Sequence, residues 1–251
     1  MQVDPIEQFQ IHNMAPLFAI GGHEFHFTNS ALLMFIIVAL VTLLLVGATA
    51  PRAVVPGRLQ SIAELSYEFV ANTVRSSAGT EGMKFFPFVF TLFMFVLFAN
   101  LIGLIPYSFT VTSQLIVTAT LALLVFFIVV IYGFYRNGLH FLNLFVPKGV
   151  PKVILPAIVI IEVLSFLSRP VSHSVRLFAN MLAGHITLQV FAGFIILLGT
   201  GLGALGWAGG ILPFAMIVIL FALETLVAFL QAYVFAILTC IYLNDAIHPG
   251  H

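Results

Sequence analysis

Five long apolar runs limit the fold of this chain more than any other feature. A helix needs about 20 residues to cross a hydrocarbon core of roughly 30 Å. Runs of about this length or longer lie at 31–50, 85–106, 115–135, 153–198 and 210–243. Only 7% of the residues are charged, whereas a soluble domain carries about 25%. The sequence therefore predicts an all-α polytopic membrane protein with five membrane-crossing helices.

The segment between the first two runs is too polar to cross a membrane. Its polar side chains share one face at helical spacing, which is typical of an amphipathic helix at a membrane surface. These side chains are Ser61, Glu64, Glu68, Asn72 and Arg75. We expect this helix at about 58–78. The chain then divides into an N-terminal segment, 1–30, and a single transmembrane domain, 31–251.

Basic residues are distributed unevenly over the connections between the runs. They are Arg52, Arg58, Arg75 and Lys84 in one connection, and Arg136, Lys148 and Lys152 in another. The alternate connections, around 107–114 and 199–209, contain neither lysine nor arginine, and nor do the first 30 residues. Basic residues favour the cytoplasmic side of a membrane. We therefore expect the N-terminus outside and the C-terminus in the cytoplasm.

The stretch SRPVSHSVRLFAN, residues 168–180, puts two arginines inside the fourth apolar run. A loop there would bring Arg169 and Arg176 to the outer face, against the distribution of the other basic residues. The alternative is one helix of about 45 residues, roughly 65–70 Å long, which has to tilt. Pro170 is tolerated in it as a local kink.

Helical geometry favours the single long helix. Polar residues of the run fall within about 80° of the helix circumference, namely Glu162, Ser165, Arg169, His173, Arg176, Asn180 and Thr187. One polar stripe that faces protein or water lowers the cost of placing arginine in a membrane.

The last two runs are predicted to pair as a long, tilted antiparallel hairpin about the glycine-rich turn GTGLGALGWAGG. In regular helices this pairing puts Arg176 opposite Gln231. It also puts Glu162 opposite Asp245, and His185 opposite Glu224. Polar residues thus meet at three depths, which predicts a polar path between the two helices.

An asparagine and two glycines within the apolar runs are expected to serve helix packing and not function. Asn100 lies alone in the second run, where an interhelical hydrogen bond is the expected role. Gly103 and Gly184 are expected to be close-packing positions.

The titratable residues favour ion translocation. Arg176 lies centrally in an apolar helix with no acid of this chain clearly opposite it, so we expect it to meet a charge from elsewhere. His185 and Glu224 on one side, and Glu162 and His173 on the other, can exchange protons near neutral pH if their surroundings shift them. No metal, Walker, GxSxG or dinucleotide motif is present, so we expect no metal and no cofactor. Nine basic and nine acidic residues cancel, which gives no bias toward nucleic acid.

Three blocks of the sequence resemble a known family. RPVSHSVRLFANMLAGHITL strongly resembles the signature of subunit a from the membrane sector of F-type ATP synthases, bacterial and mitochondrial. FANLIGLIPYSFTVTSQL and DPIEQFQI resemble further blocks of that family. The resemblance implies a stator beside a rotating ring of subunit c, with peripheral-stalk subunit b, other ATP synthase subunits and the lipid bilayer as partners. It implies a chain that is not catalytic alone, in a bacterial inner membrane or, alternatively, a mitochondrial one.

The resemblance also implies roles for single residues. The essential arginine between two half-channels corresponds to Arg176. The outer half-channel corresponds to Asn180, His185, Glu224 and Gln231. The cytoplasmic half-channel is assigned to Glu162, Ser165, Arg169, His173 and Asp245. His173 departs from the family pattern, in which we expect an apolar or small residue.

Two other function classes are compatible with five apolar helices. A self-contained proton-coupled secondary transporter predicts inverted repeats and broken helices around a midplane site, and no convincing internal repeat is visible. A membrane-embedded enzyme requires a nucleophile–base pair or a metal set, and neither is evident in the sequence.

Overall fold

The computed structural model describes residues 9–20, 23–49, 56–105, 108–146 and 154–248. Within these residues five helices are long and apolar enough to cross a membrane, as predicted. They contain α1 (Asn29–Thr49), α3 (Phe86–Gly103), α4 (Leu115–Asn137), α5 (Leu155–Gly209) and α6 (Ile211–Ile247). Their bounds follow the apolar runs closely, except that α5 extends further than the fourth run. Short 3-10 helices connect them: η2 (Met83–Phe85), η3 (Val111–Ser113) and η4 (Gly138–Phe145).

The N-terminal segment contains a β-hairpin, which was not predicted from the sequence. Strand β1 (Asn13–Ile20) pairs antiparallel with β2 (His23–Thr28), which runs directly into α1. The side chain of Asn29 ties the chain before the hairpin to this junction. It accepts a hydrogen bond from the His12 backbone N–H at 3.2 Å and donates one to the Gln10 carbonyl at 3.1 Å.

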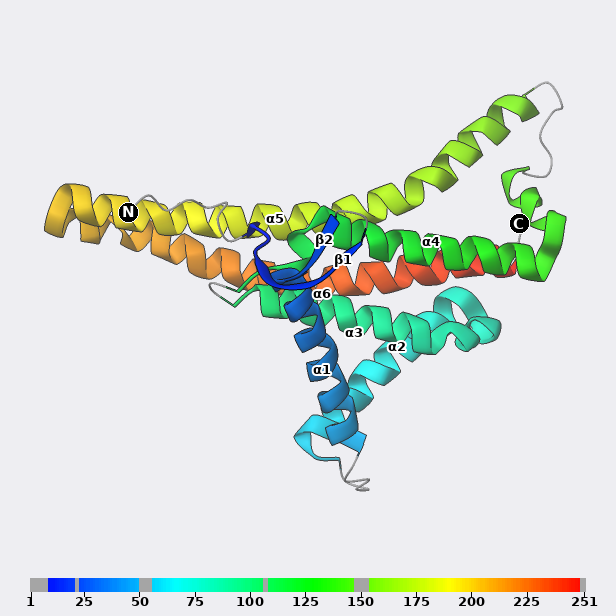
Figure 1. Ribbon diagram of the computed structural model, residues 1–251, viewed down its shortest axis with the longest axis horizontal. Helices are drawn as coiled ribbons and strands as arrows, with labels where there is room; N and C mark the ends of the chain where they lie inside the picture. Colours follow the sequence, from blue (N-terminus) through cyan, green and yellow to red (C-terminus); the bar gives the residue numbers. More distant parts are fainter. Residues whose placement is uncertain (1–8, 21–22, 50–55, 106–107, 147–153, 249–251) are drawn as a thin grey trace.

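Helix α2 (Arg58–Gly82) is amphipathic, as predicted, and longer than expected. It passes a kink at Gly79, whose φ of 67° favours glycine. Apolar side chains of its first half, such as Leu59 and Leu65, are exposed, whereas Val70 and Val74 in its second half are buried. Because this second half packs against α3 and α6, α2 is part of the core and not a detached surface helix (Figure 1).

Helices α5 and α6 form the predicted antiparallel hairpin and extend beyond the rest of the molecule (Figure 1). Residues 168–180 lie inside α5, with Pro170 in the helix, so the single-helix interpretation is confirmed and the loop is excluded. The chain reverses at Gly203, which has φ 58° and ψ −133°. We call the end at Gly203 the turn end of the hairpin, and the end at Leu155 and Ile247 its open end.

The core of the molecule surrounds α6. Residues of α2, α3 and α4 pack with α6 into one buried cluster. Along α6 this cluster contains Ala232, Phe235, Ala236, Cys240, Leu243 and Ala246. Small side chains let membrane helices approach closely, so the alanines of α6 permit packing against several neighbours at once. In Figure 1, α6 lies between α5 and α3, which leaves α5 with a face that no described helix covers.

Candidate functional site

The polar stripe of α5 lies along the edge of its buried face. Phe166, Leu177 and Met181 pack into the protein interior. Within the stripe His173 is buried, and Glu162 and Arg169 are half-buried. The remaining members are exposed, namely Ser165, Arg176, Asn180 and Thr187. The stripe therefore has one side inside the protein and one side turned away from it.

Arg176 is on the exposed side of the stripe. None of the other described side chains forms an ion pair or hydrogen bond with its guanidinium. Gln231, which was predicted to lie opposite it, is buried on α6 and 8% exposed. No hydrogen bond joins these two residues, so their pairing stays a prediction. An arginine at membrane depth costs about 2.5–3.5 kcal/mol on insertion scales, so this position requires water or an outside charge.

A buried His–Glu pair lies toward the turn end. The His185 Nε2 and Glu224 Oε1 atoms are 3.7 Å apart, and both side chains are buried, which confirms that these residues face each other. Neither carboxyl oxygen of Glu224 has a hydrogen-bond partner among the described residues. Gly184 makes room for this carboxyl group, because a Cβ at that position would lie 2.8 Å from Glu224 Cδ. Gly184 is thus a close-packing position, as expected, and what it contacts is a carboxyl group.

A polar network next to His185 was not predicted as part of the site. Thr110 Oγ1 lies 3.1 Å from His185 Nε2. Two residues further on, Thr112 Oγ1 donates to Asn100 Oδ1 at 2.8 Å, and Asn100 Nδ2 donates to the Ala228 carbonyl at 3.2 Å. The expected interhelical hydrogen bond of Asn100 is therefore confirmed. The signal in the sequence was the polar run TVTSQ between two apolar runs, from which no site residue was predicted.

The N-terminal segment contacts the same histidine. The Phe9 ring lies edge-on to the His185 ring, with centroids 6.2 Å apart. Gln114 Nε2 donates to the Phe9 carbonyl at 2.8 Å and so fixes the segment against the start of α4. The side chains that contact His185 therefore come from segments that are far apart in the sequence.

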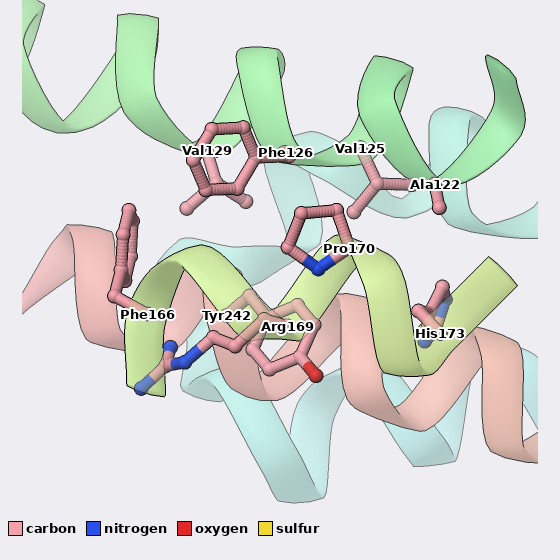
Figure 2. A pocket seen from close by; sticks show the side chains of 9 residues that line it. All are labelled: Ala122, Val125, Phe126, Val129, Phe166, Arg169, Pro170, His173 and Tyr242. Atoms are coloured by element: carbon pink, nitrogen blue, oxygen red, sulfur yellow. The ribbon is translucent and has the colours of Figure 1, made fainter. Parts of the chain in front are cut away.

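A second group of charged residues lies toward the open end. Arg169 Nη1 is 2.7 Å from Asp245 Oδ2. The guanidinium also lies 5.1 Å from the centre of the Phe166 ring and 5.0 Å from that of Tyr242 (Figure 2). The predicted pairing of Glu162 with Asp245 is therefore wrong. The reason is that the open end of α5 rises away from α4 and α6 (Figure 1). This helix contains Pro170, and a proline bends a helix.

His173 lies between these two groups. It is 4% exposed, and its ring centre is 3.9 Å from that of Phe235. Its Nε2 atom is buried without a hydrogen-bond partner among the described residues. Figure 2 shows His173 at one end of a small cavity between α4, α5 and α6. From α4 only apolar side chains line it: Ala122, Val125, Phe126 and Val129.

An ion pair joins the ends of α2 and α4 near the open end of the hairpin. Arg136 Nη2 is 2.5 Å from Glu81 Oε2, which joins the end of α4 to the end of α2. Next to it, Asn137 Nδ2 donates to the Ala246 carbonyl at 2.7 Å. Three of the basic residues used for the predicted orientation, Arg52, Lys148 and Lys152, lie outside the described residues. Across the described part of the chain, no group of three or more His, Cys, Asp and Glu side chains is arranged to hold a metal ion.

Comparison with known proteins gives consistent similarities over the whole chain. The sequence profile of the family described as ATP synthase A chain matches residues 31–244. The chain is 67% identical, over 254 residues and 100% of both chains, to ATP synthase subunit a of Bradyrhizobium diazoefficiens. It is 66% identical over 249 residues to the subunit a of Nitrobacter winogradskyi, covering 99% of this chain and 100% of the relative. With the same coverage, it is 64% identical over 249 residues to that of Rhodopseudomonas palustris strain BisB18.

Proposed function

Because this chain belongs to the ATP synthase A chain family, we propose that it is the stator proton-channel subunit of a rotary F-type ATP synthase. The relatives named above are bacterial, and within the described residues five helices are long and apolar enough to cross a membrane, which supports a location in the bacterial inner membrane. The ring of subunit c, peripheral-stalk subunit b and the other ATP synthase subunits are the proposed partners. The chain is not catalytic alone and serves as the ion-translocating subunit of the complex.

The exposed, unpaired guanidinium of Arg176 is the observation that most supports this proposal. A ring carboxylate that passes this face of α5 meets a positive charge, which favours the ionised form of the carboxyl group. The proton is then released. The same charge repels a proton that would pass straight from one side of the site to the other, so Arg176 separates the two half-channels.

The turn-end residues are the proposed outer half-channel. A proton enters past Asn180, His185, Glu224 and Gln231 and neutralises a ring carboxylate. The neutral carboxyl group can then face lipid, because the cost of placing a charge in hydrocarbon is removed. The contact between His185 and Glu224 supports this assignment, since two titratable groups this close can exchange a proton directly or through one water.

The open-end residues are the proposed cytoplasmic half-channel. After nearly a full turn of the ring, the carboxyl group approaches Arg176 from the other side and loses its proton. That proton leaves past Glu162, Ser165, Arg169, His173 and Asp245. Each elementary charge that crosses the membrane contributes about 2.3 kcal/mol per 100 mV, which the ring converts into torque. The N-terminus is then outside and the C-terminus in the cytoplasm.

The Arg176→Ala variant tests this proposal in the assembled complex. We expect ATP-driven acidification of inverted membrane vesicles to be abolished, because nothing then forces the ring carboxyl group to release its proton. Arg75→Ala is the matched control, since Arg75 is an exposed arginine of α2 away from the site, and it should pump normally. Substantial pumping by Arg176→Ala, with normal amounts of assembled complex, would refute the role given to Arg176.

A second measurement separates this function from a secondary transporter. The purified chain alone in liposomes should show no proton-coupled solute uptake, because the ring carboxylate is missing. Uptake by the isolated chain would overturn the stator proposal in favour of a self-contained transporter.

A further inference from the structure

The buried hydroxyl of Thr110 lies against the histidine of the proposed outer half-channel. Thr110 directly precedes η3, in extended backbone with φ −95° and ψ 108°, and it is 0% exposed. Its Oγ1 atom is 3.1 Å from His185 Nε2, which is within the range of a hydrogen bond. The Glu224 Oε1 atom is 3.7 Å from the same nitrogen, which is too far for one. The hydroxyl, and not the carboxyl group, therefore holds this side of the imidazole ring.

Several contacts with α3 and η3 fix the position of Thr110. Gly103 of α3 lets it approach closely, because a Cβ at that glycine would lie 2.7 Å from Thr110 Cγ2. The Thr110 carbonyl accepts hydrogen bonds from Ser113, at 2.7 Å from its hydroxyl and at 3.2 Å from its backbone N–H. Helix η3 is in turn hydrogen-bonded to Asn100 of α3. The hydroxyl is thus held by α3 and η3, and not by α5, the helix that carries the histidine.

A threonine hydroxyl can bond to an imidazole nitrogen in either protonation state of that nitrogen. It donates its proton to the bare nitrogen, and it accepts once the nitrogen carries a proton. In the second case its own proton can turn toward the Gly103 carbonyl, which is 3.5 Å from Thr110 Oγ1. A carbonyl group could only accept, and an ammonium group could only donate. Thr110 can therefore keep its contact with His185 Nε2 while the ring gains and loses a proton.

We propose that Thr110 is a positioning residue of the outer half-channel, whose hydroxyl holds the His185 ring in one place while the ring takes up and releases a proton. Both carboxyl oxygens of Glu224 lack a hydrogen-bond partner among the described residues, and a carboxylate attracts a charged imidazole. The hydrogen bond to Thr110 opposes this attraction. Proton exchange between His185 and Glu224 then takes place at one separation. This inference rests on the proposed function.

Passive proton conduction tests this role in vesicles that contain the complete membrane sector with the ATPase headpiece removed. Thr110→Val has nearly the same shape but no hydroxyl. We expect conduction to fall about tenfold, the effect of one lost hydrogen bond on a barrier. Thr110→Ser keeps the hydroxyl and loses the methyl group that lies next to Gly103. It should conduct within about twofold of the unaltered chain.

The two substitutions separate a positioning role from a packing role. If Thr110 only fills space beside Gly103, Thr110→Val conducts normally and Thr110→Ser is the defective variant. That result, or equal conduction by the two variants, overturns the proposal.

Thr73→Val is the matched control on α2. Thr73 is also buried, and its hydroxyl donates to the Phe69 carbonyl of its own helix at 2.9 Å. This variant should conduct normally, because Thr73 is outside the site. A loss equal to that of Thr110→Val would mean that removal of any buried hydroxyl has this effect, and it would overturn the proposal.

A density map of the complete complex provides a readout that does not depend on assembly of the variants. We expect Thr110 Oγ1 within about 3.2 Å of His185 Nε2, and a hydroxyl turned away from the ring would overturn the proposal. The two proposals fail separately. Normal pumping by Arg176→Ala overturns the proposed function, whereas an inactive Arg176→Ala with a fully active Thr110→Val overturns only the role of Thr110.

Discussion

Arg169 and Arg176 are about two turns apart on one helix, yet their surroundings are opposite. The guanidinium of Arg169 is paired with Asp245 and lies against two aromatic rings. Arg176 is exposed and has no pairing with any described residue. The first arginine stabilises contact between α5 and α6 inside the subunit. Arg176 destabilises the protein in the membrane unless water or a charge from outside the subunit interacts with it. We therefore assign the two arginines different roles.

The position of the Glu224 carboxyl group depends on the absence of a side chain at residue 184. An added Cβ there would overlap the carboxyl group, so Gly184→Ala should push it away from His185. We expect proton conduction to fall by up to about 10²-fold, since a misplacement of about 1 Å has this effect in other sites. Gly193→Ala is the matched control on the same helix, because a Cβ there meets nothing within 4 Å. Equal conduction by the two variants would show that the position of the Glu224 carboxyl group is not critical.

The α5–α6 hairpin turns at a residue whose backbone favours glycine. Gly203 has φ 58° and ψ −133°, a conformation that costs other residues about 1–3 kcal/mol. Gly203→Ala should therefore lower the melting temperature of the purified complex. Gly201→Ala, where φ is ordinary and a Cβ has open space, should leave it nearly unchanged. An equally stable Gly203→Ala complex would mean that the turn can rearrange without loss.

The kink at Pro170 explains why the predicted register holds at one end of this hairpin and fails at the other. His185 faces Glu224 as expected, because the helices are regular between these residues and the turn. Beyond Pro170 the partner of Asp245 is Arg169, seven residues away from the predicted Glu162. The predicted pairs assume two regular helices counted outward from the turn. A bend in one helix shifts every pair that lies beyond it.

The ends of three helices meet near the open end of the hairpin. The Glu81–Arg136 ion pair and the Asn137–Ala246 hydrogen bond hold the ends of α2, α4 and α6 together. This arrangement is compatible with the orientation expected from the charges, in which that end faces the cytoplasm.

Cysteine labelling measures this orientation. Cys240 is buried and is the single cysteine of the chain, so Cys240→Ser provides a background without thiols. Two exposed positions, Met14 on β1 and Leu139 on η4, receive one cysteine each. A membrane-impermeant maleimide should label Met14→Cys in spheroplasts and Leu139→Cys only in inverted vesicles. The reverse pattern would invert the proposed direction of both half-channels.

Most of the helices could be predicted from the sequence, because they depend on local composition and on the spacing of apolar and polar residues. Long apolar runs identify helices that cross a membrane, and the polar stripe through Arg176 distinguishes a continuous α5 from a loop. The pairing of His185 with Glu224 also follows, since both lie close to the turn. These predictions concern neighbours along one helix or residues joined by a short connection.

Other features depend on contacts between distant segments. Helical spacing carries no information about Thr110 next to His185, about Phe9 held there by Gln114, or about the β-hairpin before α1. Nor does it show which side of the polar stripe is covered, because that depends on where α4 and α6 pack. Local spacing thus determined the helices and the polar line along α5. Packing decided that His173 is enclosed and Arg176 exposed, since burial depends on which other helices come close.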